Sequence, residues 1–263
     1  MRTTILAATA TTALLLIAGT AHAATLEQVF DKVYDVHPGA LISLDNTNGA
    51  VIVRAASDNR VHIHALKHVE SFHSDTLRTA MNDLRIEVKP ESGGLKILTR
   101  YPKQNEGFLS WLAGDNANAS VRYTLDVPRE SNLDVETVNG HIEVADVTGS
   151  MKLDTTNGRI EVTRCRGAID AETTNGGIHA ELLSVAGGRP MHFETTNGRI
   201  SVRVPRNLAA SIDAATTNGG ISTELPVAST STHRHTLRGT MNGGGPELKL
   251  RTTNGPIEIL ASN

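Results

Sequence analysis

Acidic side chains recur through the C-terminal half of the chain at spacings that would let two of them act together. They are Asp154, Glu161, Asp170, Glu172 and Glu194. Glycoside hydrolysis needs a pair of carboxyl groups beside one sugar bond, so these residues raise the question of a carbohydrate-active enzyme. The acids recur with a sequence repeat instead of gathering at one place, which is typical of the solvent-facing positions of amphipathic strands. We therefore predict no enzymatic activity and keep a carbohydrate-active β-helix enzyme as the alternative.

Histidines are the second group that could do chemistry, because imidazoles on one strand face can bind one metal ion. His62, His64 and His68 lie close together, and His233 and His235 are two residues apart. The first group alternates with apolar residues, as on any exposed strand face, and a defined site needs further ligands and supporting hydrogen bonds. We predict no metal site and no cofactor.

Other catalytic motifs are missing from the sequence, including a nucleophile elbow, a zinc-binding helix motif and a phosphate-binding glycine loop. The single cysteine, Cys165, cannot form an internal disulfide and stands between two arginines, where we expect an ordinary turn residue. An apolar segment around the only tryptophan is more suggestive, since aromatic residues are enriched at interface centres. Its candidate partner contacts are Phe108, Leu109, Trp111 and Leu112. A plug over one end of the hydrophobic core is the favoured interpretation and a docking site the alternative.

A sequence repeat must position all of these residues. Asn-Gly followed two residues later by an apolar residue occurs seven times, at Asn48-Gly49, Asn139-Gly140, Asn157-Gly158, Asn175-Gly176, Asn197-Gly198, Asn218-Gly219 and Asn254-Gly255. Apolar residues also stand seven and five positions before each glycine. Because side chains alternate across a strand, the pattern predicts two short strands with one apolar face each, meeting at the dipeptide.

The spacing of the repeat separates two all-β folds. Asn-Gly between strands is the usual signal of a β-hairpin, so an antiparallel β-meander is the alternative. From Gly140 onward the glycines are 18, 18, 22 and 21 residues apart, which suits one solenoid coil of two strands and two corners. We predict a parallel β-helix or β-solenoid with two short strands per 18–22-residue coil. We expect Asn and Gly at the corner because both tolerate left-handed backbone angles.

We predict a single domain over residues 24–263, made of three parts. Residues 24–53 form the first coil, residues 54–132 a strand-rich capping insertion, and residues 133–263 the regular repeats. The insertion also carries a short helix expected to be capped by Ser74, and it would hide the unpaired strand edges at one solenoid end. Residues 230–245, rich in Ser, Thr and Gly, are expected to form a loop.

The first residues predict export. A basic start, a mostly apolar run from Ile5 to Gly19 and small residues closing on Ala23 are the three parts of a secretory signal peptide. We predict cleavage after Ala23, a periplasmic or extracellular chain, and no transmembrane segment after cleavage. The net charge of -3, with no run of like charges, also predicts no nucleic-acid partner.

The order of these features resembles a known family. The signal peptide is followed by Leu41-Ile42-Ser43-Leu44 before Asn48-Gly49, by an insertion ending in Tyr123-Thr124-Leu125-Asp126-Val127-Pro128, and by Thr-x-Asn-Gly repeats. Over about residues 30–260 the chain is similar to the bacterial "putative adhesin" family of β-strand-repeat proteins, which is also catalogued as a domain of unknown function. The resemblance implies a right-handed parallel β-helix, an exported location, no established activity and no catalytic residue.

The sequence thus predicts an exported, non-enzymatic, adhesin-like β-solenoid that binds an envelope protein or glycan, or that is a structural protein of the envelope. A self-associating envelope scaffold is a further alternative, because uncovered strand edges at the coil ends would favour association.

Overall fold

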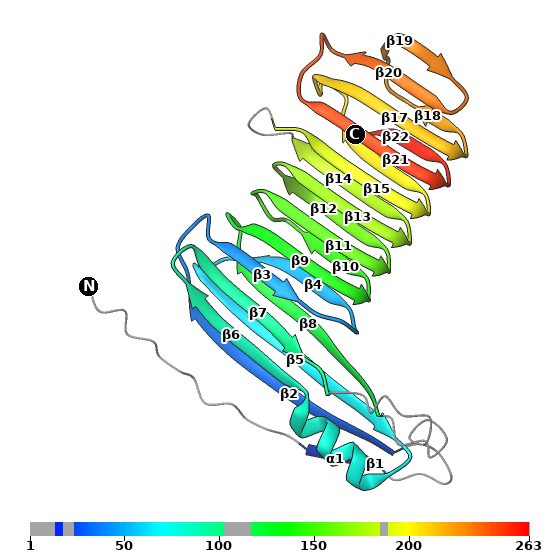
Figure 1. Ribbon diagram of the computed structural model, residues 1–263. Helices are drawn as coiled ribbons and strands as arrows, with labels where there is room; N and C mark the ends of the chain where they lie inside the picture. Colours follow the sequence, from blue (N-terminus) through cyan, green and yellow to red (C-terminus); the bar gives the residue numbers. More distant parts are fainter. Residues whose placement is uncertain (1–13, 18–23, 103–116, 185–188, 263) are drawn as a thin grey trace.

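The computed structural model describes residues 14–17, 24–102, 117–184 and 189–262 (Figure 1). In this part of the chain, two eleven-stranded sheets, here called sheet A and sheet B, face each other along an elongated column. The two strands that meet at an Asn-Gly corner lie in different sheets, and strands of neighbouring coils pair in parallel. The fold is therefore a β-solenoid, and the antiparallel meander is excluded.

Each coil takes one strand from each sheet. In sheet B these are β3 (Leu41–Asp45), β9 (Asn132–Asn139), β11 (Met151–Asn157), β13 (Ile169–Asn175), β15 (Met191–Asn197), β17 (Ala210–Asn218) and β21 (Glu247–Asn254). In sheet A they are β4 (Val51–Ala56), β10 (Ile142–Ala145), β12 (Ile160–Arg166), β14 (Ile178–Ser184), β16 (Ile200–Pro205), β18 (Ile221–Thr223) and β22 (Ile257–Ser262).

The core is built from the apolar columns of the repeat. Every residue seven or five positions before a corner glycine is buried, and so is every residue two positions after it, except Ile221 in the outermost coil. Threonines three positions before the glycine are buried as well, and each donates its hydroxyl to the glycine carbonyl of the adjacent coil, as Thr155 does to Gly140 at 3.0 Å. The polar atom inside the core is thereby satisfied.

The corners are held by an asparagine ladder. Each side-chain amide after Asn48 donates to the side-chain carbonyl of the adjacent coil on the cap side, for example Asn157 to Asn139 at 2.8 Å and Asn175 to Asn157 at 2.9 Å. The Asn48 amide donates to the Ala119 backbone carbonyl at 3.2 Å. No corner asparagine has a positive φ, and among the corner glycines only Gly49 and Gly255 do. The expected left-handed corner was therefore wrong. Glycine is needed because coils approach closely: a Cβ on Gly158 would lie 2.0 Å from the carbonyl oxygen of Gly140.

The order of the coils in space differs from their order in the sequence. In sheet B, β21 lies between β15 and β17, and in sheet A, β22 lies between β16 and β18 (Figure 1). Along the sequence, the outermost coil, β17 and β18, therefore comes before the coil that lies beneath it, β21 and β22. The last coil of the sequence is consequently an interior coil, with a strand ladder on both sides.

Antiparallel strands close both ends of the column. At the C-terminal end, β20 (Thr236–Met241) pairs with β17 and with β19 (Ala228–His233), so most of the expected 230–245 loop is a hairpin. Its sequence suggested a loop because only Leu237 and Met241 of these strands are buried apolar residues.

At the other end, the capping insertion adds a further coil. Strands β7 (Gly94–Arg100) and β8 (Asn118–Pro128) run parallel to β3 and β4. The antiparallel strands β6 (Arg85–Glu91) and β5 (Arg60–Ser71) then cover β7 and β8.

Strand β2 (Ala24–Asp35) joins this cap by pairing antiparallel with β5, so the predicted first coil, residues 24–53, contributes strands to both the cap and the solenoid. Strand β1 (Leu14–Ile17), inside the predicted signal peptide, pairs with β2. Helix α1 (Ser74–Asp83) contacts β5 and β2, and it begins after His73, so Ser74 is its first residue and not its cap. None of the helices described reaches the length and hydropathy needed to span a membrane.

Candidate functional site

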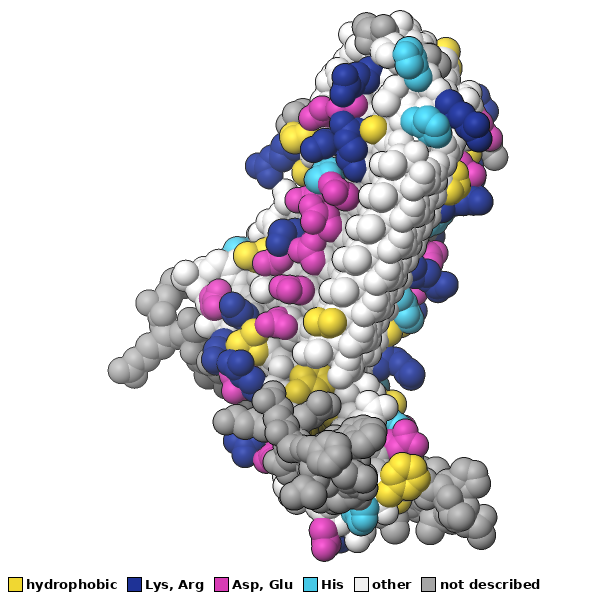
Figure 2. Space-filling model, turned by 45° about the vertical axis from the view of Figure 1, so that its right-hand side comes forward, with side chains coloured by type: hydrophobic (Ala, Val, Ile, Leu, Met, Phe, Trp, Pro, Cys, Tyr) yellow, Lys and Arg dark blue, Asp and Glu magenta, His cyan; other side chains and the backbone are white. Residues whose placement is uncertain are grey.

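The outer face of sheet B carries a column of carboxylates. Its members stand four positions before successive corner glycines and are in register on neighbouring strands: Glu136, Asp154, Glu172 and Glu194. Figure 2 shows the acidic side chains in a row beside uncharged columns that run along the solenoid. Like charges placed directly opposite each other across a ladder are unfavourable, so the acids repel one another wherever no cation lies against the column.

A second column, of threonines, lies between the acidic column and the Asn-Gly corners. A shallow groove runs along the two columns and is lined by Thr156, Thr174 and Thr196 and by the four acids. Partial burial, followed by the charges of Asp170, Asp154 and Glu194, raises the pKa of Glu172 above its ordinary value. Asp154 is compensated by Lys152, whose ammonium lies 2.9 Å away and whose pKa is raised by that contact. The groove therefore offers hydroxyl groups beside concentrated negative charge.

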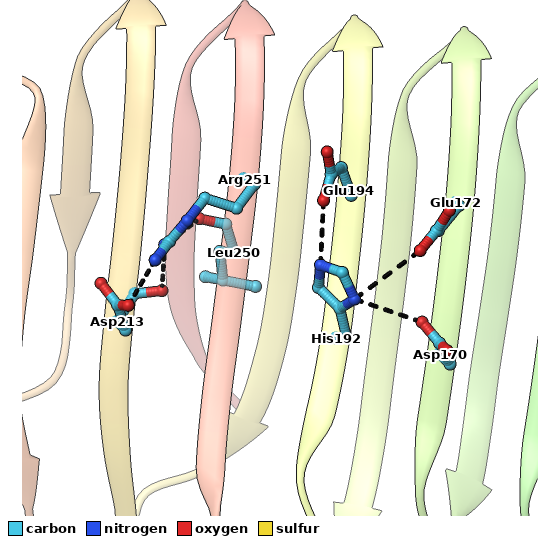
Figure 3. Close-up of polar contacts among 7 residues, drawn as sticks. All are labelled: Asp170, Glu172, His192, Glu194, Asp213, Leu250 and Arg251. Carbon is cyan, nitrogen blue, oxygen red and sulfur yellow. Dashed lines mark hydrogen bonds and ion pairs between the residues drawn. The ribbon is translucent and has the colours of Figure 1, made fainter.

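Histidine 192 lies in the middle of the acids. Its Nδ1 is 3.4 Å from Asp170 Oδ1 and 3.7 Å from Glu172 Oε1, and its Nε2 is 3.1 Å from Glu194 Oε2 (Figure 3). The next coil reverses the charge, because Arg251 stands in register with Glu194 and pairs with Asp213 (Figure 3). The acidic face thus ends at the C-terminal coil.

The structure brings together four of the five acids that the sequence singled out. Asp154, Asp170, Glu172 and Glu194 lie on sheet B, whereas Glu161 lies on sheet A, near Arg159 at 3.7 Å. Sequence reasoning missed His192 as their neighbour. Alignment of the repeats would have found it, because His192 and Asp170 both stand six positions before a corner glycine and are in register.

The histidines first considered for metal binding do not converge. His62, His64 and His68 lie beside three different carboxylates, those of Asp58, Asp31 and Glu27, at 3.0, 2.6 and 3.1 Å respectively. His233 is exposed, and His235 Nδ1 lies 2.9 Å from the Gly219 carbonyl. His64 and His68 therefore pair across the β2–β5 ladder, and His62 pairs with the turn before its own strand.

Cys165 is a buried side chain on β12, and burial raises the pKa of its thiol to about 11. A thiolate is the reactive form, so burial and the raised pKa both disfavour reaction of this cysteine. The expected turn position was wrong, because Cys165 lies within a strand. The predicted partner contacts Phe108, Leu109, Trp111 and Leu112 lie outside the described residues, between β7 and β8.

Comparisons with known proteins address the family and not the site. No curated protein matches the chain. A structure titled as a putative cell adhesion protein from Clostridium sporogenes ATCC 15579 is 11% identical, with 89% of this chain and 100% of that chain covered and a TM-score of 0.46. A putative adhesin from Bacteroides fragilis NCTC 9343 is 11% identical, with 89% and 97% covered and a TM-score of 0.32. The model of the Toastrack DUF4097 family, a domain of unknown function, matches residues 79–260, and the chain belongs to that family.

Proposed function

We propose that the protein is an exported, non-enzymatic, adhesin-like binding protein of the cell envelope and that the outer face of sheet B binds its partner. The observation that supports this is the acidic column. Like charges in register across a ladder are unfavourable, and positions that break a local folding rule are expected where a surface has a function. The partner we infer is an envelope component, protein or glycan, that presents positive charge to the carboxylates and hydrogen-bonding groups to the threonines.

Neutralising two acids of the column should weaken capture of the partner. We expect the variant Glu136→Gln/Asp154→Asn to retain less partner from a native envelope extract, because two of the four negative charges are gone. Its free energy of unfolding should be unchanged or slightly higher, since like-charge repulsion falls. Capture by the unchanged protein should also weaken as salt is raised.

The matched control is Glu143→Gln/Glu161→Gln, which makes the same charge change in the same two coils but on sheet A. Equal capture by both variants and the unchanged protein would contradict the assignment of the binding face. Both variants leave Asp170, Glu172 and His192 intact.

A carbohydrate-active enzyme is the second candidate, favoured by one distance. Carboxylate oxygens of Asp170 and Glu172 lie within 4.8 Å of each other, close to the separation of about 5–5.5 Å used by retaining glycosidases. Both acids stand on one strand of an open face, with side chains 49% and 53% exposed, whereas glycosidases place their two carboxyl groups on either side of the sugar bond. We expect no release of reducing ends from envelope glycans; release that is abolished by Asp170→Asn/Glu172→Gln would favour the enzyme.

Self-association through the coil ends is the least supported alternative. Antiparallel strands cover the coil ends in both sheets, with the exception of β18, so the edge strands among those described are β18, β1, β6 and β19. Strands β18 and β1 are very short and β6 carries Lys89 and Pro90, features that limit pairing with another chain, which leaves the six-residue β19 as the edge open to association.

A further inference from the structure

Three metal-ligating atoms converge on the outer face of sheet B. Asp170 and Glu172 point to the same side of β13, and His192 faces them from β15 (Figure 3). A nitrogen of His192 and one oxygen of each acid all lie within 4.8 Å of one another. Among the described residues, this is the one group of three His, Cys, Asp or Glu side chains that meets that condition.

The two histidine nitrogens face different acids. Nε2 lies 3.1 Å from Glu194 Oε2, and a carboxylate can only accept, so the tautomer that forms this hydrogen bond carries its proton on Nε2. In that tautomer Nδ1 presents a lone pair to Asp170 Oδ1 at 3.4 Å and to Glu172 Oε1 at 3.7 Å. Three acceptors facing one another are repulsive unless a positive charge lies among them.

One oxygen of the group has no other partner. Asp170 Oδ1 is inaccessible to solvent and forms no hydrogen bond with any described residue, although 49% of the Asp170 side chain as a whole is exposed. A buried carboxylate oxygen without a donor loses its hydration without compensation. A cation bound by Nδ1 and the two carboxylates would supply the missing interaction and neutralise the repulsion.

We propose that Asp170, Glu172 and His192 bind a divalent transition-metal cation of the zinc class, with Glu194 orienting the imidazole. A tetrahedral metal with bonds of about 2.0–2.2 Å places its ligand atoms about 3.3–3.6 Å apart. The separation of 3.4 Å lies in that range, and the separation of 3.7 Å is slightly longer and would have to shorten on binding. One imidazole nitrogen with two carboxylate oxygens suits zinc, whereas calcium and magnesium prefer oxygen ligands alone. A carboxylate on the second imidazole nitrogen is the usual support of a metal-ligating histidine.

The neighbouring coils show why the site is single. Lys152 on β11 is in register with Asp170, and Lys249 on β21 is in register with His192, so a lysine flanks the group on each side. Lys152 forms an ion pair with Asp154 and lies outside the group. The acids are partly exposed, which leaves the fourth coordination position open to water or to a side chain of a partner.

This metal site goes beyond the proposed function and does not depend on it.

Titration calorimetry tests the proposal with zinc alone as the probe. The purified protein, stripped with a chelator and titrated with Zn²⁺ at pH 7.5, should bind one equivalent at a site that Mg²⁺ and Ca²⁺ do not compete for. His192→Gln should weaken binding at least tenfold, and Glu194→Gln, which removes only the supporting contact, about 10–100-fold. The matched control is His64→Gln, which removes a histidine that lies 2.6 Å from a single carboxylate, that of Asp31, and it should leave the affinity unchanged.

Absence of one-to-one zinc binding would overturn the proposal. Equal affinity in His192→Gln, or an equal loss in His64→Gln, would overturn it as well. Replacement of zinc by calcium at the site would overturn the metal class. His192, Glu194 and His64 are not buried, so we expect the three variants to fold normally. An unchanged melting temperature in the absence of metal checks this.

Discussion

A chain that ends at Gly245 should lose the folded outermost coil and its hairpin as well as the last coil of the sequence. The missing strands β21 and β22 pair on both sides, so the outermost coil and its hairpin lose the surface on which they stack. Four fully buried side chains go with them: Leu248, Leu250, Ile257 and Ile259. At about 1.5–3 kcal/mol each, their loss is comparable to the whole stability of a domain, about 5–15 kcal/mol.

Limited proteolysis and thermal unfolding measure this effect. In the truncated chain, residues 210–245 should become protease-sensitive and the main transition should move to much lower temperature. The control replaces the end hairpin β19–β20 with a flexible linker, which removes only Leu237 and Met241 from the buried set and should leave all coils folded. A truncated chain that melts like the full chain would contradict an interior position of the last coil.

Substitution of Gly158 by Ala should destabilise the solenoid by about 3 kcal/mol or more. The new Cβ would lie 2.0 Å from the carbonyl oxygen of Gly140, and this atom belongs to the backbone of the adjacent coil and cannot rotate away. Separating the coils would stretch the ladder hydrogen bonds and the Asn157–Asn139 contact. We expect the loss in the free energy of unfolding measured by denaturant titration.

Two glycines provide the controls for this substitution. A Cβ on Gly93 or Gly220 would meet no atom within 4 Å, and neither residue has a positive φ. Alanine at these positions should change stability by less than about 0.5 kcal/mol. If Gly158→Ala were as mild as Gly220→Ala, close coil contact would not be the reason for glycine at the corner.

The repeat made most of the fold predictable, because burial follows a period that can be read directly. The apolar columns, the buried threonines and the parallel coils all follow from it. The order of the coils in space could not be predicted from the repeat. Every coil carries the same columns and the same asparagine, so Asn254 completes the ladder equally well at the end or between Asn197 and Asn218, where it lies.

The candidate site was predicted only as a set of outward acids. Their meeting with His192 depends on register between coils, since Asp170 and His192 are 22 residues apart and share one position of the repeat. The corner chemistry was misjudged for a related reason. Asn-Gly usually signals unusual backbone angles, but here it provides a side-chain ladder and room for the neighbouring backbone.

Disulfide trapping tests the order of the coils most directly. Thr196, Thr253 and Thr217 are exposed residues of the same column, on β15, β21 and β17. Neighbouring strands lie about 4.8 Å apart, within reach of a disulfide, whereas strands two places apart are beyond the limit of about 7 Å. In a Cys165→Ala background, Thr196→Cys/Thr253→Cys should cross-link on mild oxidation and Thr196→Cys/Thr217→Cys should not. Cross-linking of only the second pair would show that the coils follow sequence order, and it would contradict the interior position of the C-terminal coil.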